Sequence, residues 1–130
     1  MVIDTSAILA VMLHEEDNLI YANAIRNAGS VSISAGTLTE LGVVLTSRLG
    51  RDISPQIDAF VARAGFIVEP VTEPLARSAW SGYLRYGKGL HPAGLNFGDC
   101  FAYALAKERG EPLLYKGNDF SRTDIQSALA

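Results

Sequence analysis

Short apolar segments that alternate with longer amphipathic segments constrain the fold of this chain more than any other feature of its sequence. Strands are predicted at residues 2–3, 31–34, 66–68 and 113–115, and apolar residues recur at helical spacing between them. Apolar strands that alternate with helices of about ten to fifteen residues form mainly parallel sheets, so we expect helices on both faces. In such folds, sites form beyond the carboxyl ends of the strands.

The size of the chain predicts a single domain, residues 1–130, whose core needs no disulfide or structural metal. Charged residues make up 19% and apolar residues 48%, so long disordered arms are not expected. The longest apolar run, residues 7–13, is too short to span a membrane, and the start of the chain lacks the pattern of a signal peptide. Since Cys100 is the only cysteine, no internal disulfide forms, and we expect a cytoplasmic location.

Capping residues predict where several helices begin. Thr5 or Ser6 is expected to cap the first helix, and Asn96 is expected to cap the last. Thr37 and Glu40 have the spacing of a capping box, which predicts that a helix begins at Thr37.

Four acidic residues are predicted to share one edge of the sheet. Asp4 follows the first strand, Asp119 lies just past the last one, and Glu40 and Asp99 are expected in first turns of helices at that edge. Each has a structural alternative. Asp4 could cap a helix, Glu40 could complete the capping box, Asp99 could complement a helix dipole, and Asp119 could be a turn residue.

Carboxylates gathered in this way repel one another and raise one another's pKa unless a cation neutralises them. Oxygen ligands favour Mg²⁺ or Mn²⁺, and such ions can activate a water molecule and stabilise the charge that develops on a phosphodiester. The net charge of −3 argues against nucleic-acid binding through a broad basic surface. It leaves room for binding through bound cations, which supply positive charge locally.

Four segments together resemble PIN-domain ribonucleases of the VapC toxin class. They are VIDTSAI at the start, TLTE before an apolar helix, LNFGDCFAYALAKERGEPLLYKGNDF at residues 95–120, and the terminal SRTDI. The resemblance covers essentially the whole chain, and residues 95–120 are its most specific part. It implies a three-layer α/β/α sandwich with a mainly parallel central sheet. It also implies Mg²⁺- or Mn²⁺-dependent endonucleolytic cleavage of RNA and inhibition by a VapB-like antitoxin.

The resemblance also implies roles for individual acids. Asp4, Glu40 and Asp99 correspond to metal-binding, catalytic acids of the family, with Glu40 as a ligand or as the base that orients the attacking water. In the GNDF segment the fourth acid is expected at Asp119, and Asn118 is the alternative.

Three polar residues are candidates to hydrogen-bond these ligands, although each could simply cap a helix. They are Thr5, Ser6 and Asn96, and Asn118 is a further candidate for such a contact. Basic residues in or beside loops near the same edge are either phosphate contacts or ordinary solvated surface. They are Arg85, Lys88, Lys116 and Arg122.

Other motifs predict no site. Residues 82–89 approach a phosphate-binding P-loop, but no Ser or Thr follows Lys88 and no strand precedes the segment. His14, His91 and Cys100 lack zinc-ligand spacing, and Cys100 is interpreted as a small core residue.

Two other functions compete with a toxin nuclease. A phosphatase with Asp4 as nucleophile would need a second aspartate where Ser6 stands. A catalytically inactive PIN-like interaction module would have little reason to retain four acids. Among partners, the resemblance predicts an antitoxin, an RNA substrate and a homodimer, with no membrane. The sequence does not distinguish transfer RNA from ribosomal RNA as the target, since unpaired or structured RNA is recognised through loop shape.

Overall fold

A parallel sheet of four short strands organises the computed structural model, which describes residues 1–130. The strands are β1 (Val2–Ile3), β2 (Ser32–Ser34), β3 (Ile67–Glu69) and β4 (Leu113–Leu114), in the spatial order β3-β2-β1-β4. Val2 of β1 pairs with Ser32 on one side and with Leu113 on the other. The chain moves outward from β1 to β3 and then crosses back to place β4 on the free side of β1. The carboxyl ends of β1 and β4 therefore flank the point where the strand order reverses, where α/β folds place their sites.

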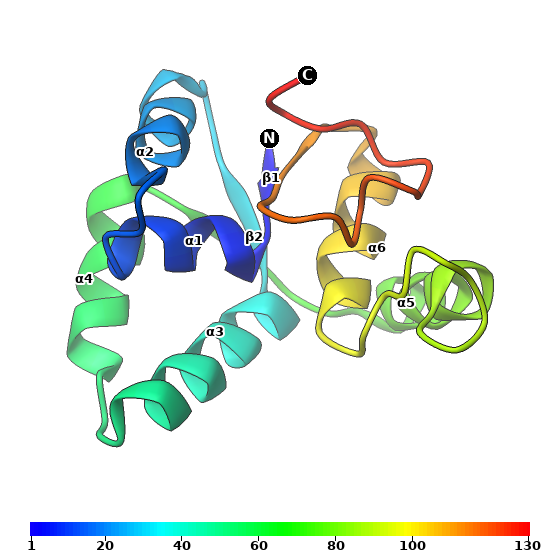
Figure 1. The fold of residues 1–130 in the computed structure, drawn as a ribbon, viewed down its shortest axis with the longest axis horizontal. Helices are drawn as coiled ribbons and strands as arrows, with labels where there is room; N and C mark the ends of the chain where they lie inside the picture. Colours follow the sequence, from blue (N-terminus) through cyan, green and yellow to red (C-terminus); the bar gives the residue numbers. More distant parts are fainter.

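Six helices cover the two faces of this sheet. Figure 1 shows α1 (Thr5–Met12), α2 (Asn18–Asn27), α3 (Ala35–Leu49) and α4 (Ser54–Ala64) on one side, with α5 (Glu73–Tyr86) and α6 (Asp99–Arg109) on the other. Consecutive strand residues point to opposite faces, so Ile3 and Leu114 pack with α1 to α4, whereas Val2 and Leu113 pack with α5 and α6. The predicted three-layer sandwich with a parallel sheet is confirmed.

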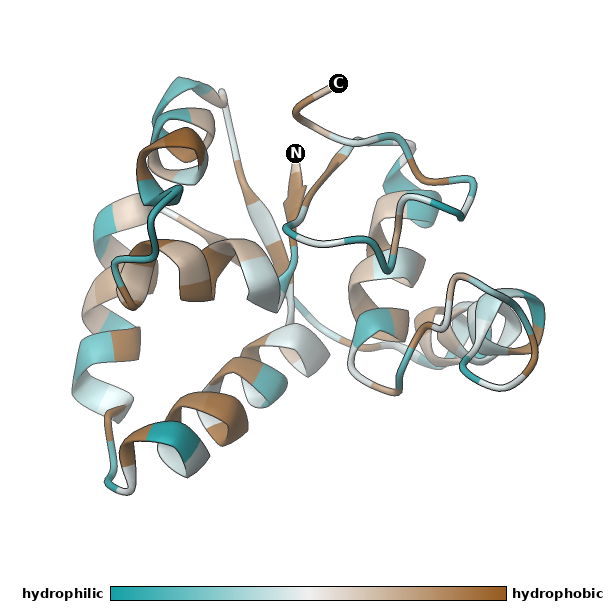
Figure 2. Ribbon diagram, in the orientation of Figure 1, coloured by the Kyte–Doolittle hydropathy of each residue, from teal (hydrophilic) through white to brown (hydrophobic).

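Hydropathy follows the same arrangement. In Figure 2 strand β1 is brown, whereas the chain after β4 alternates teal stretches with pale and brown ones. The last segment packs onto the domain through the buried ring of Phe120 and through Asp124, which accepts hydrogen bonds from the Tyr103 hydroxyl at 2.8 Å and from Lys107 Nζ at 2.9 Å.

No helix has both the length and the apolar composition that a membrane crossing requires.

Two of the predicted helix starts are wrong. The cap of α1 is Asp4 rather than Thr5 or Ser6, because its carboxylate accepts the Ser6 N–H at 3.0 Å. Helix α3 begins at Ala35, where the Ser34 hydroxyl accepts the Gly36 N–H at 3.2 Å. The end of strand β2 thus supplies a cap three residues before Thr37. Glu40 consequently lies in the second turn of α3 and takes no part in a capping box.

The predicted cap of the last helix is confirmed. The Asn96 side-chain oxygen accepts the Asp99 N–H at 2.9 Å, and the Asp99 carboxylate accepts the Asn96 N–H at 3.0 Å. These reciprocal hydrogen bonds have the form of a capping box and fix one carboxylate oxygen of Asp99.

Candidate active site

Two carboxylates are buried at the carboxyl edge of the sheet. Asp4 follows β1 and is 3% exposed, and Asp99 opens α6 and is 6% exposed. Glu40 approaches from α3, which follows β2, and is half-buried. Acidic residues are almost never buried to this degree unless they are paired, yet no ion pair in the structure involves any of these three.

Helix capping does not account for Asp4, as a comparison within the chain shows. Asp4-Thr5-Ser6 and Asp52-Ile53-Ser54 form the same local hydrogen bonds, in which the serine N–H and hydroxyl both donate to the aspartate. These bonds lower the pKa of the exposed Asp52. Burial raises the pKa of Asp4 to about 6 despite the same bonds, and the charge of Glu40 adds to the rise. Capping a helix does not require an aspartate to be buried, so the burial of Asp4 needs another explanation.

Asp99 has the more strongly shifted pKa of the two buried acids. Burial raises its pKa to about 7, against the lowering effect of the Asn96 N–H, and the charges of Asp4, Asp119 and Glu40 raise it further. Three acids distant from Asp99 in sequence therefore lie close enough to act on it. The predicted convergence of four acids on one edge agrees with the structure, while their catalytic roles remain predictions.

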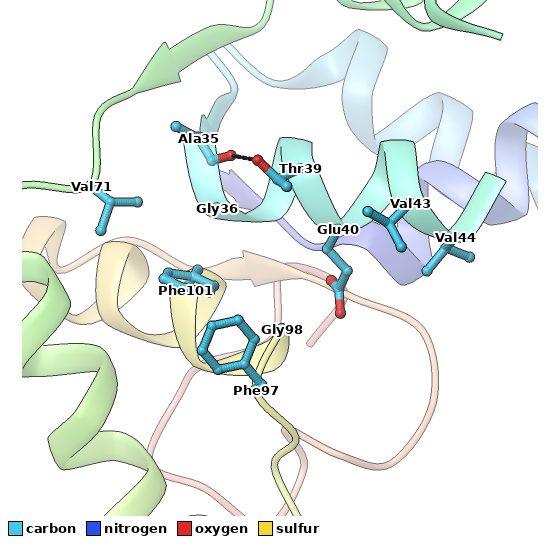
Figure 3. A pocket seen from close by; sticks show the side chains of 10 residues that line it. All are labelled: Ala35, Gly36, Thr39, Glu40, Val43, Val44, Val71, Phe97, Gly98 and Phe101. Atoms are coloured by element: carbon cyan, nitrogen blue, oxygen red, sulfur yellow. Dashed lines mark hydrogen bonds between the residues drawn. The ribbon is translucent and has the colours of Figure 1, made fainter. Parts of the chain in front are cut away.

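Glu40 is held between Thr5 and Gly98. The Thr5 hydroxyl donates to Glu40 Oε1 at 2.5 Å. A β-carbon built on Gly98 would overlap the Glu40 carboxylate, and Figure 3 shows the Glu40 side chain extending from α3 toward Gly98. Gly98 has φ −65° and ψ −39°, which any residue can adopt, so close approach of the carboxylate is what requires glycine here. Sequence reasoning missed this residue, although a glycine directly before Asp99 was the available signal.

Gly98→Ala should separate activity from stability. The added methyl group displaces the Glu40 carboxylate, whereas the φ and ψ of Gly98 suit alanine without backbone strain. We expect RNA cleavage to fall about tenfold or more, with an unfolding free energy close to that of the wild type. Cleavage rates and urea unfolding measure the two effects.

Gly42→Ala is the matched control for this substitution. Gly42 lies inside α3 with open space where its β-carbon would be, so this variant should gain stability and keep its activity. If Gly98→Ala cleaves RNA as fast as Gly42→Ala, the position of the Glu40 carboxylate is unimportant.

Ser6 connects Asp4 to the chain that follows β4. Its hydroxyl donates to Asp4 Oδ2 at 2.6 Å and accepts the Lys116 N–H at 2.9 Å. The predicted hydrogen bonds of Thr5, Ser6 and Asn96 with the acids are therefore all present. Thr5 binds Glu40 and Ser6 binds Asp4. Asn96 both contacts Asp99 and caps its helix.

Two of the four basic residues proposed as phosphate contacts are engaged elsewhere. Lys116 Nζ pairs with Glu15 at 2.7 Å and with Asp17 at 2.8 Å, and Arg85 pairs with Asp124 at 3.5 Å. These ion pairs argue against Lys116 and Arg85 as phosphate ligands. Both of the others, Lys88 and Arg122, are exposed and form no ion pair.

The fourth acidic position lies in an exposed turn. Asp119 and Asn118 are both exposed, just before the buried Phe120. The charge of Asp119 raises the pKa of Asp99, so Asp119 lies near enough to act on that buried acid. The choice between Asp119 and Asn118 remains a prediction. The carbonyl of Asn118 accepts the Ser121 hydroxyl at 2.8 Å, a local turn contact.

The donor set suits a hard divalent cation. All four candidates offer carboxylate oxygens, and Asp4 Oδ1 is buried without any hydrogen-bond partner. Yet no three Asp, Glu, His or Cys side chains are close enough together to form a complete set of ligands. An ion held here would take part of its coordination from water, as Mg²⁺ usually does.

Comparisons with known proteins agree with this fold. The family model described as PIN domain matches residues 1–126. Over 130 residues the chain is 51% identical to a VapC ribonuclease of Mycobacterium bovis and to ribonuclease VapC28 of Mycobacterium tuberculosis, covering 99% of this chain and 98% of each relative. The chain belongs to the PIN-domain family, and its full-length relatives there are VapC ribonucleases. The resemblance read from the sequence is confirmed.

The solved structures extend this agreement to the fold. Mycobacterium tuberculosis VapC20, described as a sarcin-ricin loop cleaving toxin, aligns with a TM-score of 0.77 at 21% identity over 95% of both chains. A toxin–antitoxin complex from Klebsiella pneumoniae contains a chain that aligns with a TM-score of 0.68 at 15% identity, over 95% of this chain and 92% of that one.

Proposed function

We propose that this chain is a Mg²⁺- or Mn²⁺-dependent endoribonuclease and the toxin of a toxin–antitoxin pair. One observation carries the proposal: two carboxylates, Asp4 and Asp99, are buried at the carboxyl edge of the sheet with no basic side chain paired to them, and the charges of two further acids act on the pKa of Asp99. Such an arrangement is costly unless a cation neutralises it. Full-length similarity to VapC ribonucleases supports the same reading.

The four acids would have different roles in phosphodiester hydrolysis. Asp4 and Asp99 would be the central ligands of the cation, which when bound would neutralise phosphate charge and activate water. Glu40 acts as a further ligand or as the base that orients the attacking water, and Asp119 completes the site directly or through water. Thr5 and Ser6 keep the carboxylates of Glu40 and Asp4 in place through the hydrogen bonds described above.

The substrate proposed is transfer RNA or ribosomal RNA, whose cleavage would inhibit translation. Among the structural neighbours, VapC20 is described as cleaving the sarcin-ricin loop, which makes a structured RNA target one candidate for this chain. We further propose a VapB-like antitoxin that lies in a groove near the acids, a homodimer, and a cytoplasmic location. The toxin–antitoxin complex among the neighbours supports an antitoxin partner.

The competing functions have less support. A phosphatase with Asp4 as nucleophile lacks the second aspartate, since Ser6 binds Asp4 instead, and the relatives are ribonucleases. An inactive PIN-like module would not require Asp4 and Asp99 to remain buried and unpaired.

Cleavage of total cellular RNA by the purified protein tests the proposal. We expect discrete cuts with Mg²⁺ or Mn²⁺ and none with excess chelator, because the carboxylates need the ion to hold and activate water. Sequencing of the new RNA ends would identify both the target and the bond that is cut. Cleavage that continues in chelator would refute a metal-dependent mechanism.

A further inference from the structure

Aromatic side chains are exposed beside the acids. Phe97 lies two residues before Asp99 and is 79% exposed, although a phenylalanine at the start of a helix could have packed inward. Its ring contacts that of Phe101 edge to face, with centroids 5.1 Å apart and planes at 90° (Figure 3). Trp80 on α5 is also 63% exposed.

Phe97 and Phe101 line two neighbouring grooves, and Trp80 lines one of them. One groove, of about 580 Å³, lies between α5 and the start of α6 and includes Trp80, Lys88 and Asn96. The other, of about 540 Å³, includes Glu40 and Gly98. An occupant of the first groove would therefore lie directly beside the candidate active site.

One basic residue, Lys88, lines the first groove, and its backbone is fixed by hydrogen bonds. Lys88 N–H donates to the Leu95 carbonyl at 2.9 Å, and the Tyr83 hydroxyl donates to the Lys88 carbonyl at 3.1 Å. The loop that carries Lys88 is thus tied to the residue before Asn96. The Lys88 side chain itself has no acidic partner.

We propose that the groove between α5 and α6 binds an unpaired base of the RNA substrate, stacked on Phe97 and Trp80, with Lys88 contacting a neighbouring phosphate. Aromatic faces combined with a cation are the means by which proteins hold single-stranded nucleic acid. Because Phe97 and Phe101 line both this groove and the one that includes Glu40 and Gly98, such a base would lie beside the proposed active site. This inference rests on the proposed function, for which it supplies a substrate-positioning site.

The test uses the full-length Asp99→Asn variant, in which cleavage should be suppressed, and a short single-stranded RNA of mixed sequence. Trp80 is the only tryptophan, so its fluorescence reports directly on the groove. We expect the RNA to quench Trp80, and an abasic ribose-phosphate oligomer of equal length to leave it unchanged. In the same background, Phe97→Ala should weaken RNA binding roughly tenfold, and Phe97→Tyr should retain it.

Two further variants sharpen the test. Leu84→Ala removes an apolar side chain of α5 that is as exposed as Trp80 but does not line the groove. This variant should leave RNA affinity unchanged. Lys88→Met should make the fall of log RNA affinity with log salt concentration less steep, by about one in slope.

Equal affinity for RNA and for the abasic oligomer, or unquenched Trp80, would overturn the base site. A Phe97→Ala variant that loses self-association or antitoxin binding while keeping its RNA affinity would also overturn it, and would assign the groove to a protein partner. The proposed function fails differently: wild-type protein that is quenched by RNA yet never cleaves it with metal would refute the nuclease and leave the base site standing.

Discussion

Asp99→Asn should lower RNA cleavage at least about 100-fold and leave the fold intact. The amide is a poor ligand for a divalent cation, so the variant loses the negative charge that the proposed mechanism requires. The structure of the helix start does not depend on that charge, because the asparagine oxygen can still accept the Asn96 N–H. Cleavage rates in Mg²⁺ or Mn²⁺, with circular dichroism and thermal unfolding as checks of the fold, measure the effect.

Asp58→Asn is the matched control for this substitution. It changes the net charge equally, but Asp58 is exposed on α4, away from the carboxyl edge of the sheet. Its cleavage rate should equal that of the wild type. Wild-type cleavage by Asp99→Asn, or an equal loss in Asp58→Asn, would contradict the role proposed for Asp99.

The fold was predictable because strand and helix signals agree along the chain. The apolar pairs at residues 2–3 and 113–114 are buried on both faces, as their unbroken hydrophobicity indicates. The start of α3 was not predictable from its local pattern. Thr37 and Glu40 satisfy the capping-box spacing, but Ser34 at the end of β2 caps the helix first and leaves the Thr37 hydroxyl buried without a partner.

The candidate site was predictable only where topology determines it. The position of Asp4 after β1 places it at the strand-order reversal, and helix α6 brings Asp99 beside it. By contrast, the pairing of Lys116 with Glu15 and Asp17 and the contact of Gly98 with Glu40 join residues far apart in sequence. No local pattern encodes such contacts, so the sequence left Lys116 as either a phosphate contact or solvated surface, and it gave Gly98 no role.

Asp4→Asn should stabilise the metal-free protein. The rise in the pKa of Asp4 from 3.8 to about 6 corresponds to about 3 kcal/mol lost on folding at neutral pH, when the buried carboxylate is ionised. Asparagine resembles the protonated acid and still accepts the hydrogen bonds from Ser6. We therefore expect the unfolding free energy in chelator at pH 7.5 to rise by up to about 3 kcal/mol, as measured by urea unfolding.

The pH dependence gives this prediction a definite sign. A pKa raised in the folded state means that the folded protein binds the proton more tightly, so wild-type stability falls as pH rises from about 4 to about 6. The advantage of Asp4→Asn should therefore vanish near pH 4 and be complete above about pH 7. Added Mg²⁺ should reverse the order by stabilising the wild type more than the variant, because ligand binding stabilises only the fold that holds it.

Asp52→Asn distinguishes this effect from a general response to removing an aspartate. Asp52 forms the same hydrogen bonds with Ser54 that Asp4 forms with Ser6, but its pKa is lowered, so its contribution has the opposite sign. That variant should gain no stability at pH 7.5 and should be stabilised by Mg²⁺ as much as the wild type is, because its acidic site is intact. If Asp4→Asn instead gains no stability at pH 7.5 and responds to Mg²⁺ as the wild type does, the Asp4 carboxylate is an ordinary cap. Its burial then carries no electrostatic cost for a metal ion to relieve.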